Sequence, residues 1–133
     1  MLADGTTNTL ADALPYATPD GEKENAAVFA TGKMTIQGGG TLVASGASKH
    51  AIASSKSMKI RKGATVKVTS AASDGIHADG IKLDDCTIDV RGTGGDAIDA
   101  GDDELTVGKA VVVADVATDD TKGLKANGDI LVT

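Results

Sequence analysis

One short motif recurs five times along the chain, at intervals of about two dozen residues. In each copy an apolar residue, called here the anchor, follows a small residue, and a second small residue stands two positions after it. The anchors are Val28, Ile52, Ile76, Ile98 and Leu124, separated by 24, 24, 22 and 26 residues. A repeat of this length is typical of stacked units, because each unit buries its apolar residues only against its neighbours.

Two further segments with alternating apolar residues follow each anchor. The first set lies at 34–36, 58–60, 81–83, 105–107 and 130–132. The second set lies at 41–43, 66–68, 88–90 and 111–113. Apolar residues at i and i+2, rich in Val, Ile and Thr and separated by Gly-rich or polar breaks, indicate short strands joined by turns.

The repeat predicts an all-β fold, a parallel β-helix (β-solenoid) with about five coils of roughly 24 residues and three short strands per coil. Each strand would pair with its equivalent in the next coil, about 4.8 Å away. Crossover chirality favours the right-handed form. The period-2 spacing and the 17 glycines disfavour a helical repeat protein. We expect one domain over residues 1–133.

The repeat begins and ends in the middle of a coil. The segment containing Leu2 and Leu10 would supply the last part of one coil, and Ile130 and Val132 belong to a second-position strand. Two interpretations remain open. The chain is an excised piece of a longer solenoid, or it is a subunit that stacks end to end into a filament, with these four residues at the interface.

The amino-acid composition limits the kind of core that the chain can form and the kinds of partner that it can bind. Aromatic residues make up 2% of the chain, so the core must be aliphatic. The single cysteine, Cys86, is expected to be a small core or turn residue rather than half of a disulfide. No apolar run predicts a membrane span, and residues 1–5 do not resemble a signal peptide. The net charge of −6 disfavours nucleic-acid binding.

Charge is distributed unevenly along the predicted axis. Residues 25–73 carry seven Lys or Arg and no acid, whereas residues 74–120 carry thirteen acids. Because equivalent residues of stacked coils lie close together, like charges there repel one another. A solvated acidic face is one explanation, and cation binding is the other. Ca²⁺ prefers six to eight oxygen ligands, many from carboxylates, and the candidate metal ligands are Asp74, Asp79, Asp96, Asp99, Asp102 and Asp103.

Residues at the same position relative to their anchors are expected to stack in columns along the solenoid. Asp74 and Asp96 stand two residues before their anchors, and His77, Asp99 and Lys125 stand one residue after theirs. His77 and Lys125 are therefore candidate ligand-binding residues beside the acidic column. The two histidines fall in different columns, so we expect no metal-binding pair.

A basic surface on the preceding coils could bind acidic sugars. Lys49, Lys59 and Arg61 are its candidate ligand-binding residues, although such a surface is also compatible with plain solvent exposure. Nothing in the sequence indicates a lysine with a lowered pKa or a nucleophile–base pair, so we predict that the protein is not an enzyme.

Three segments resemble a known family. They are Ala3-Asp-Gly-Thr-Thr-Asn-Thr-Leu10, Asn25-Ala-Ala-Val-Phe-Ala30 and Ser73-Asp-Gly-Ile-His-Ala78. They are similar to the secreted bacterial carbohydrate-binding β-helix proteins, which contain calcium, bind polygalacturonate-type acidic polysaccharides and are related in architecture to pectate lyases. The resemblance implies an extracellular, non-catalytic protein in which Asp74 and Asp96 hold Ca²⁺.

Overall fold

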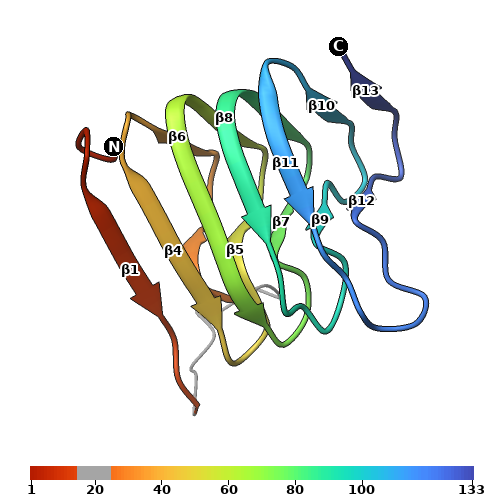
Figure 1. The fold of residues 1–133 in the computed structure, drawn as a ribbon. Coiled ribbons are helices and arrows are strands. Elements are labelled where there is room, and N and C mark those ends of the chain that lie inside the picture. The colour runs from red at the N-terminus through yellow and green to blue at the C-terminus, as the bar shows by residue number, and fades with distance from the viewer. Residues whose placement is uncertain (15–24) are drawn as a thin grey trace.

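The computed structural model describes residues 1–14 and 25–133, which form a β-solenoid of about four turns with no helix among them (Figure 1). All of the strand pairs within these residues are parallel, as the repeat predicted. The structure has about four turns, where about five coils were expected. The handedness of the coil stays a prediction.

The strands form two sheets that face each other across the core. In the large sheet the order is β1-β4-β6-β8-β10-β13, with β3 also beside β6 and β11 beside β8. In the small sheet the order is β12-β9-β7-β5-β2. The strands of the large sheet are β1 (Thr7–Ala11), β3 (Met34–Gln37), β4 (Thr41–Gly46), β6 (Met58–Ala71), β8 (Ile81–Val90), β10 (Leu105–Val107), β11 (Ala110–Ala114) and β13 (Ile130–Val132). Those of the small sheet are β2 (Ala26–Ala30), β5 (His50–Ser54), β7 (Ile76–Ala78), β9 (Ile98–Asp99) and β12 (Leu124–Lys125).

The register of the small sheet confirms the predicted anchor column. Val28 pairs with Ile52, Ile52 with Ile76, Ile76 with Ile98, and Ile98 with Leu124. The three central anchors, Ile52, Ile76 and Ile98, have no exposed surface. Complete burial of an aliphatic side chain of this size contributes about 1.5–3 kcal/mol, so the stacked anchors are a main source of stability.

The large sheet differs from the prediction of three separate strands per coil. In the two middle coils the second and third strands are continuous, as the 14-residue β6 and the 10-residue β8. Lys62 in β6 and Asp85 in β8 have φ angles of 57° and 52°, so a left-handed residue turns each strand at the corner. The pairing of β6 with β8 continues beyond that corner after a register shift between Arg61 and Ala64.

Cys86 is buried, which confirms its predicted place in the core. Burial, together with the charges of Asp84 and Asp85, raises the pKa of the Cys86 thiol to about 11. The thiol is therefore protonated at neutral pH and is a weak nucleophile.

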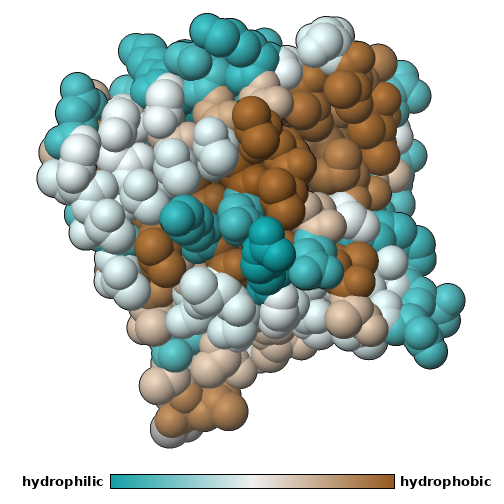
Figure 2. All heavy atoms as spheres, viewed as in Figure 1, coloured by the Kyte–Doolittle hydropathy of each residue, from teal (hydrophilic) through white to brown (hydrophobic). Residues whose placement is uncertain are grey.

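Apolar side chains lie exposed toward both ends of the solenoid. Leu10 in β1 and Ile130 and Val132 in β13 are exposed, whereas Leu2 packs against the core. Figure 2 also shows a hydrophobic patch on the side of the large sheet where β11 lies, and Val111 and Val113 of that strand are exposed. End-to-end stacking through these ends stays a prediction. Among the described residues no helix is long and apolar enough to cross a membrane.

Candidate functional site

The small sheet carries a row of charged and imidazole side chains, called here the charged row. Register pairs His77 of β7 with Asp99 of β9, and Asp99 with Lys125 of β12. His50 begins β5, and Asp74 and Asp96 lie two residues before the anchors of the next two coils. The charged row therefore consists of His50, Asp74, His77, Asp96, Asp99 and Lys125.

Backbone hydrogen bonds fix the orientation of the three carboxylates. The Asp96 N–H donates to Asp74 Oδ1 at 2.8 Å, and the Lys122 N–H donates to Asp96 Oδ1 at 2.7 Å. The Gly101 N–H donates to Asp99 Oδ1 at 2.9 Å. Each carboxylate thus uses one oxygen to bind the backbone and leaves Oδ2 for the charged row.

The Oδ2 atoms alternate with nitrogen atoms along the charged row. Asp74 Oδ2 lies 3.4 Å from His50 Nδ1 and 3.6 Å from His77 Nδ1. Asp99 Oδ2 lies 3.5 Å from His77 Nδ1 and 3.0 Å from Lys125 Nζ. Lys125 Nζ also lies 3.3 Å from Asp96 Oδ2. The stacked coils therefore bring acidic and basic groups from four strands into one network.

This network stabilises the charged forms of its strongest ion pair. Burial by itself would raise the pKa of Asp99, but hydrogen bonds from His77, the Gly101 N–H and Lys125 outweigh burial and hold that pKa well below its usual 3.8. The hydrogen bond to Asp99, with a smaller contribution from Asp96, raises the pKa of Lys125 above its usual 10.5. Asp99 is ionised and Lys125 protonated at neutral pH.

These shifts predict an acid-sensitive contribution to stability. Because the pKa of Asp99 is lowered by folding, its stabilisation is complete above about pH 3.8 and is lost as the pH falls through the lower folded value. We expect Asp99→Asn to lower the free energy of unfolding at pH 7 by about 1–3 kcal/mol. The difference from the wild type should shrink toward pH 2, as measured by urea unfolding in buffer containing a chelator.

The exposed Asp119 offers a matched control, because Asp119→Asn removes the same charge outside the network. This control should change the free energy of unfolding by less than about 0.5 kcal/mol at either pH. A difference between Asp99→Asn and the wild type that stayed constant from pH 7 to pH 2 would contradict the assigned ionisation.

Five of the predicted site residues come together in this network: Asp74, His77, Asp96, Asp99 and Lys125. The clusters of possible metal ligands within residues 1–14 and 25–133 include neither Asp79 nor the Asp102–Asp103 pair. Asp102 Oδ1 instead accepts a hydrogen bond from Asn127 Nδ2 at 2.8 Å, and Asp103 Oδ1 accepts one from the Glu104 N–H at 2.9 Å.

The two histidines are neighbours, although their different columns did not predict a contact. The rings of His50 and His77 stack with centroids 4.7 Å apart and planes 8° from parallel. Column assignment separated them because His50 stands two residues before its anchor and His77 one residue after the next. Register pairs Ile52 with Ile76, so His50 and His77 stand three positions out of register, and direct pairing across the strands does not predict the contact of their rings.

The acidic part of the charged row has limited capacity for calcium. Asp74, Asp96 and Asp99 each offer one oxygen to a common centre, whereas Ca²⁺ prefers six to eight oxygens. The ammonium of Lys125 already lies against two of these oxygens. Water or a sugar carboxylate would have to supply the remaining ligands. Calcium binding therefore stays a prediction.

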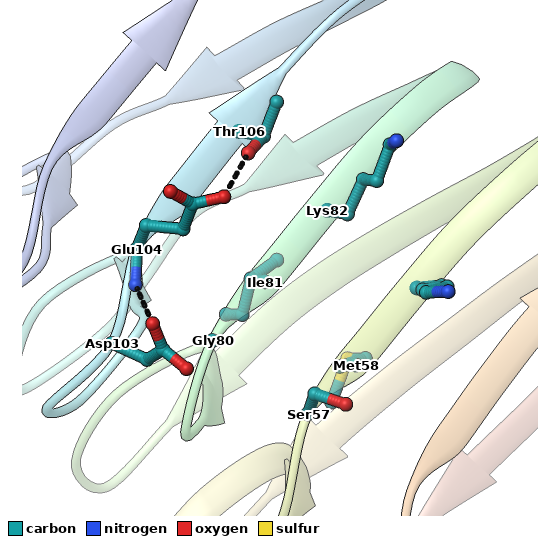
Figure 3. Close-up of a pocket in the computed structure, with 9 residues that line it drawn as sticks. Ser57, Met58, Gly80, Ile81, Lys82, Asp103, Glu104 and Thr106 are labelled. Atoms are coloured by element: carbon teal, nitrogen blue, oxygen red, sulfur yellow. Dashed lines mark hydrogen bonds between the residues drawn. The ribbon is translucent and has the colours of Figure 1, made fainter.

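A groove crosses the outer face of the large sheet, and its lining is shown in Figure 3. Its volume is about 260 Å³, and it is lined by Ser57, Met58, Lys59, Gly80, Ile81, Lys82, Asp103, Glu104 and Thr106. Lys59 of β6 and Lys82 of β8 stand opposite each other in the parallel ladder, both exposed. Glu104 Oε1 accepts a hydrogen bond from Thr106 Oγ1 at 3.2 Å.

A smaller hollow of about 110 Å³ adjoins the groove, because both are lined by Lys59 and Lys82. It adds Arg61 and Asp84. The structure thus brings together two predicted sugar-binding residues, Lys59 and Arg61, and adds Lys82 to them. Lys49, the third, lies directly before β5 and does not line either hollow.

The fold and the polar surface define a parallel β-solenoid with exposed groups suited to binding a hydroxylated or charged ligand. Over residues 1–133 the chain matches the model of a family described as carbohydrate-binding domain-containing proteins. The chain belongs to this family. Comparison with curated proteins and with solved structures gives no match.

Proposed function

We propose that this protein binds an acidic polysaccharide, without catalysis, along the groove of the large sheet. Family membership supports carbohydrate as the ligand class. The observation that carries the choice of an acidic sugar is the pairing of Lys59 with Lys82 at the groove. Two ammonium side chains on directly paired residues repel each other, and an anion placed between them removes that repulsion.

The remaining groups of the groove complement a uronic-acid polymer. Charge-assisted hydrogen bonds from lysine to a sugar carboxylate are stronger than neutral ones. Ser57, Thr106 and the carboxylates of Asp103 and Glu104 can hydrogen-bond sugar hydroxyls. The groove lining contains no aromatic side chain, so it does not offer the stacking surface that holds neutral sugars. Ion pairing therefore dominates recognition in this proposal.

Affinity electrophoresis in gels containing polygalacturonate tests the proposal. We expect the double variant Lys59→Ala/Lys82→Ala to bind more weakly by up to about thirtyfold, because each of the two exposed ion pairs contributes up to about 1 kcal/mol. Retardation should also decrease with added salt. Lys109→Ala is the matched control, since Lys109 is 85% exposed and lies outside the groove. It should bind within about twofold of the wild type.

Equal retardation of the double variant and the control would refute the groove as the binding site, and so would stronger retardation by a neutral glucan. Repeating the gels with Ca²⁺ and with a chelator tests calcium bridging through Asp74 and Asp96. Retardation that requires Ca²⁺ and is lost in Asp96→Asn would move the binding site to the charged row. An extracellular location stays a prediction.

A further inference from the structure

We propose that His50, Asp74 and His77 form a binding site for a divalent transition-metal ion such as Zn²⁺. The site lies on the small sheet, on different strands from the groove of the large sheet. It does not depend on the proposed polysaccharide binding, because it shares no residue with the groove. His50 and His77 are the only two histidines of the chain, and both contribute to this cluster.

The spacing of the donor atoms is close to that of ligands in a coordination shell. Zn²⁺ binds histidine nitrogen and carboxylate oxygen at about 2.0–2.1 Å, so two ligands of a tetrahedral ion lie about 3.3 Å apart. Asp74 Oδ2 lies 3.4 Å from His50 Nδ1 and 3.6 Å from His77 Nδ1. These two separations are close to the spacing of ligands around a tetrahedral Zn²⁺ ion.

The donor types favour a transition metal over Ca²⁺ or Mg²⁺. Imidazole nitrogen suits Zn²⁺, Cu²⁺ and Ni²⁺, whereas calcium and magnesium prefer shells made of oxygen. Two nitrogens and one carboxylate oxygen also form the ligand set of many zinc sites with an open position. Asp99 Oδ2, which lies 3.5 Å from His77 Nδ1, is placed to supply a fourth ligand.

The charge of the surroundings also favours a divalent cation. Three carboxylates face the charged row, from Asp74, Asp96 and Asp99, and Lys125 is its one fixed cation. When both imidazoles are neutral, two negative charges remain uncompensated. Side chains of the row are largely shielded from water, with Asp99 7% and Asp74 13% exposed. A divalent ion at the histidine end would neutralise that excess.

One rearrangement is required for metal binding. The two rings are stacked and nearly parallel, whereas a metal ion must lie close to the plane of each ring that ligates it. The side chain of His50 is 2% exposed, so its ring has little room to turn. The side chain of His77 is 18% exposed and has room to turn about Cβ–Cγ, a torsion with a broad energy minimum.

Isothermal titration with ZnCl₂ in chelator-free buffer tests the site. We expect His77→Gln to weaken Zn²⁺ binding more than about tenfold, because a direct ligand is lost. Asp119→Asn is the matched control, because Asp119 is exposed and lies outside the clusters of possible metal ligands. The control should bind Zn²⁺ within about twofold of the wild type, since only a distant, solvent-screened charge is removed. Equal loss in both variants, or no Zn²⁺ binding by the wild type, would overturn the proposal.

A second measurement needs no variant. With only two histidines in the chain, their ring Cε1–H resonances can be followed individually by NMR in the wild-type protein. Zn²⁺ should shift both resonances, and the same concentration of Mg²⁺ should shift neither. A shift of one ring alone would exclude the two-histidine site. Lys59→Ala/Lys82→Ala should bind Zn²⁺ like the wild type, so failure of the metal site and failure of the groove remain distinguishable.

Discussion

Replacing Gly46 with alanine is expected to destabilise the protein by about 3 kcal/mol or more. Gly46 is the last residue of β4, and a methyl group there would overlap the carbonyl group of His50, with the Ala51 nitrogen 2.8 Å away. All of these atoms belong to the backbone of β5. They cannot move aside as the end of a flexible side chain would, so β5 itself would have to shift.

Gly32→Ala is the matched control, because a methyl group at Gly32 meets no atom within 4 Å. We expect the free energy of unfolding of this variant to stay within about 1 kcal/mol of the wild type, with any change favouring the folded state. Urea unfolding followed by circular dichroism measures both variants. A Gly46→Ala protein as stable as Gly32→Ala would show that the close approach of β4 to β5 is not required.

The movement of β5 would also affect the proposed metal site, since His50 is its first residue. A Gly46→Ala protein that remains folded at low temperature should therefore bind Zn²⁺ more weakly than Gly32→Ala. This coupling is a consequence of the solenoid, in which the turn after one strand positions the functional side chain of the next.

The repeat made the fold predictable from the sequence because its spacing fixes which residues stack. The observed pairing of Ile52, Ile76 and Ile98 follows directly from the anchor column. The continuity of β6 and β8 could not be predicted, although turns were expected at both corners. In β6 the left-handed residues are Lys62 and Gly63, and in β8 the left-handed residue is Asp85. Gly63 and Asp85 are of types that adopt this conformation, but residue type does not show that the strand continues beyond the turn.

Part of the charged row could be predicted from the same columns of equivalent residues. Asp99 and Lys125 were expected to be neighbours, and their side chains lie 3.0 Å apart. The contact between the histidine rings was missed because column position describes pairing directly across strands, while His50 and His77 stand three positions out of register. Their positions relative to the anchors give no signal of this contact.

The groove of the large sheet could not be predicted, because its shape depends on the surface of the fold and not only on the spacing of residues in the sequence. Lys59 was a candidate from charge, and its position opposite Lys82 follows from the register of β6 and β8. Asp103 and Glu104, however, reach the groove from the turn before β10. The path of that turn is set by local hydrogen bonds, such as the one from the Glu104 N–H to Asp103, that no repeat position specifies.

Ile76→Ala is expected to lower the free energy of unfolding by about 3–4 kcal/mol, because the removed methyl and methylene groups leave a cavity in a closely packed core. Ile76 has no exposed surface and is stacked between Ile52 and Ile98. Each of these neighbours is itself held in place by its strand, so neither can fill the space. Ile76→Val, which removes one methyl group, should cost about 1 kcal/mol.

A second reason to expect a large loss of stability is the position of Ile76 in a central coil. In a solenoid each coil is stabilised by contacts with the coils on either side, so a cavity in a central coil weakens two interfaces at once. Val111→Ala is the control, since Val111 is 62% exposed and its loss should cost less than about 0.5 kcal/mol. Urea unfolding of all three variants tests the order Ile76→Ala, Ile76→Val, Val111→Ala. An Ile76→Ala protein destabilised no more than Val111→Ala would mean that the anchor column does not determine the stability of the coil that carries His77.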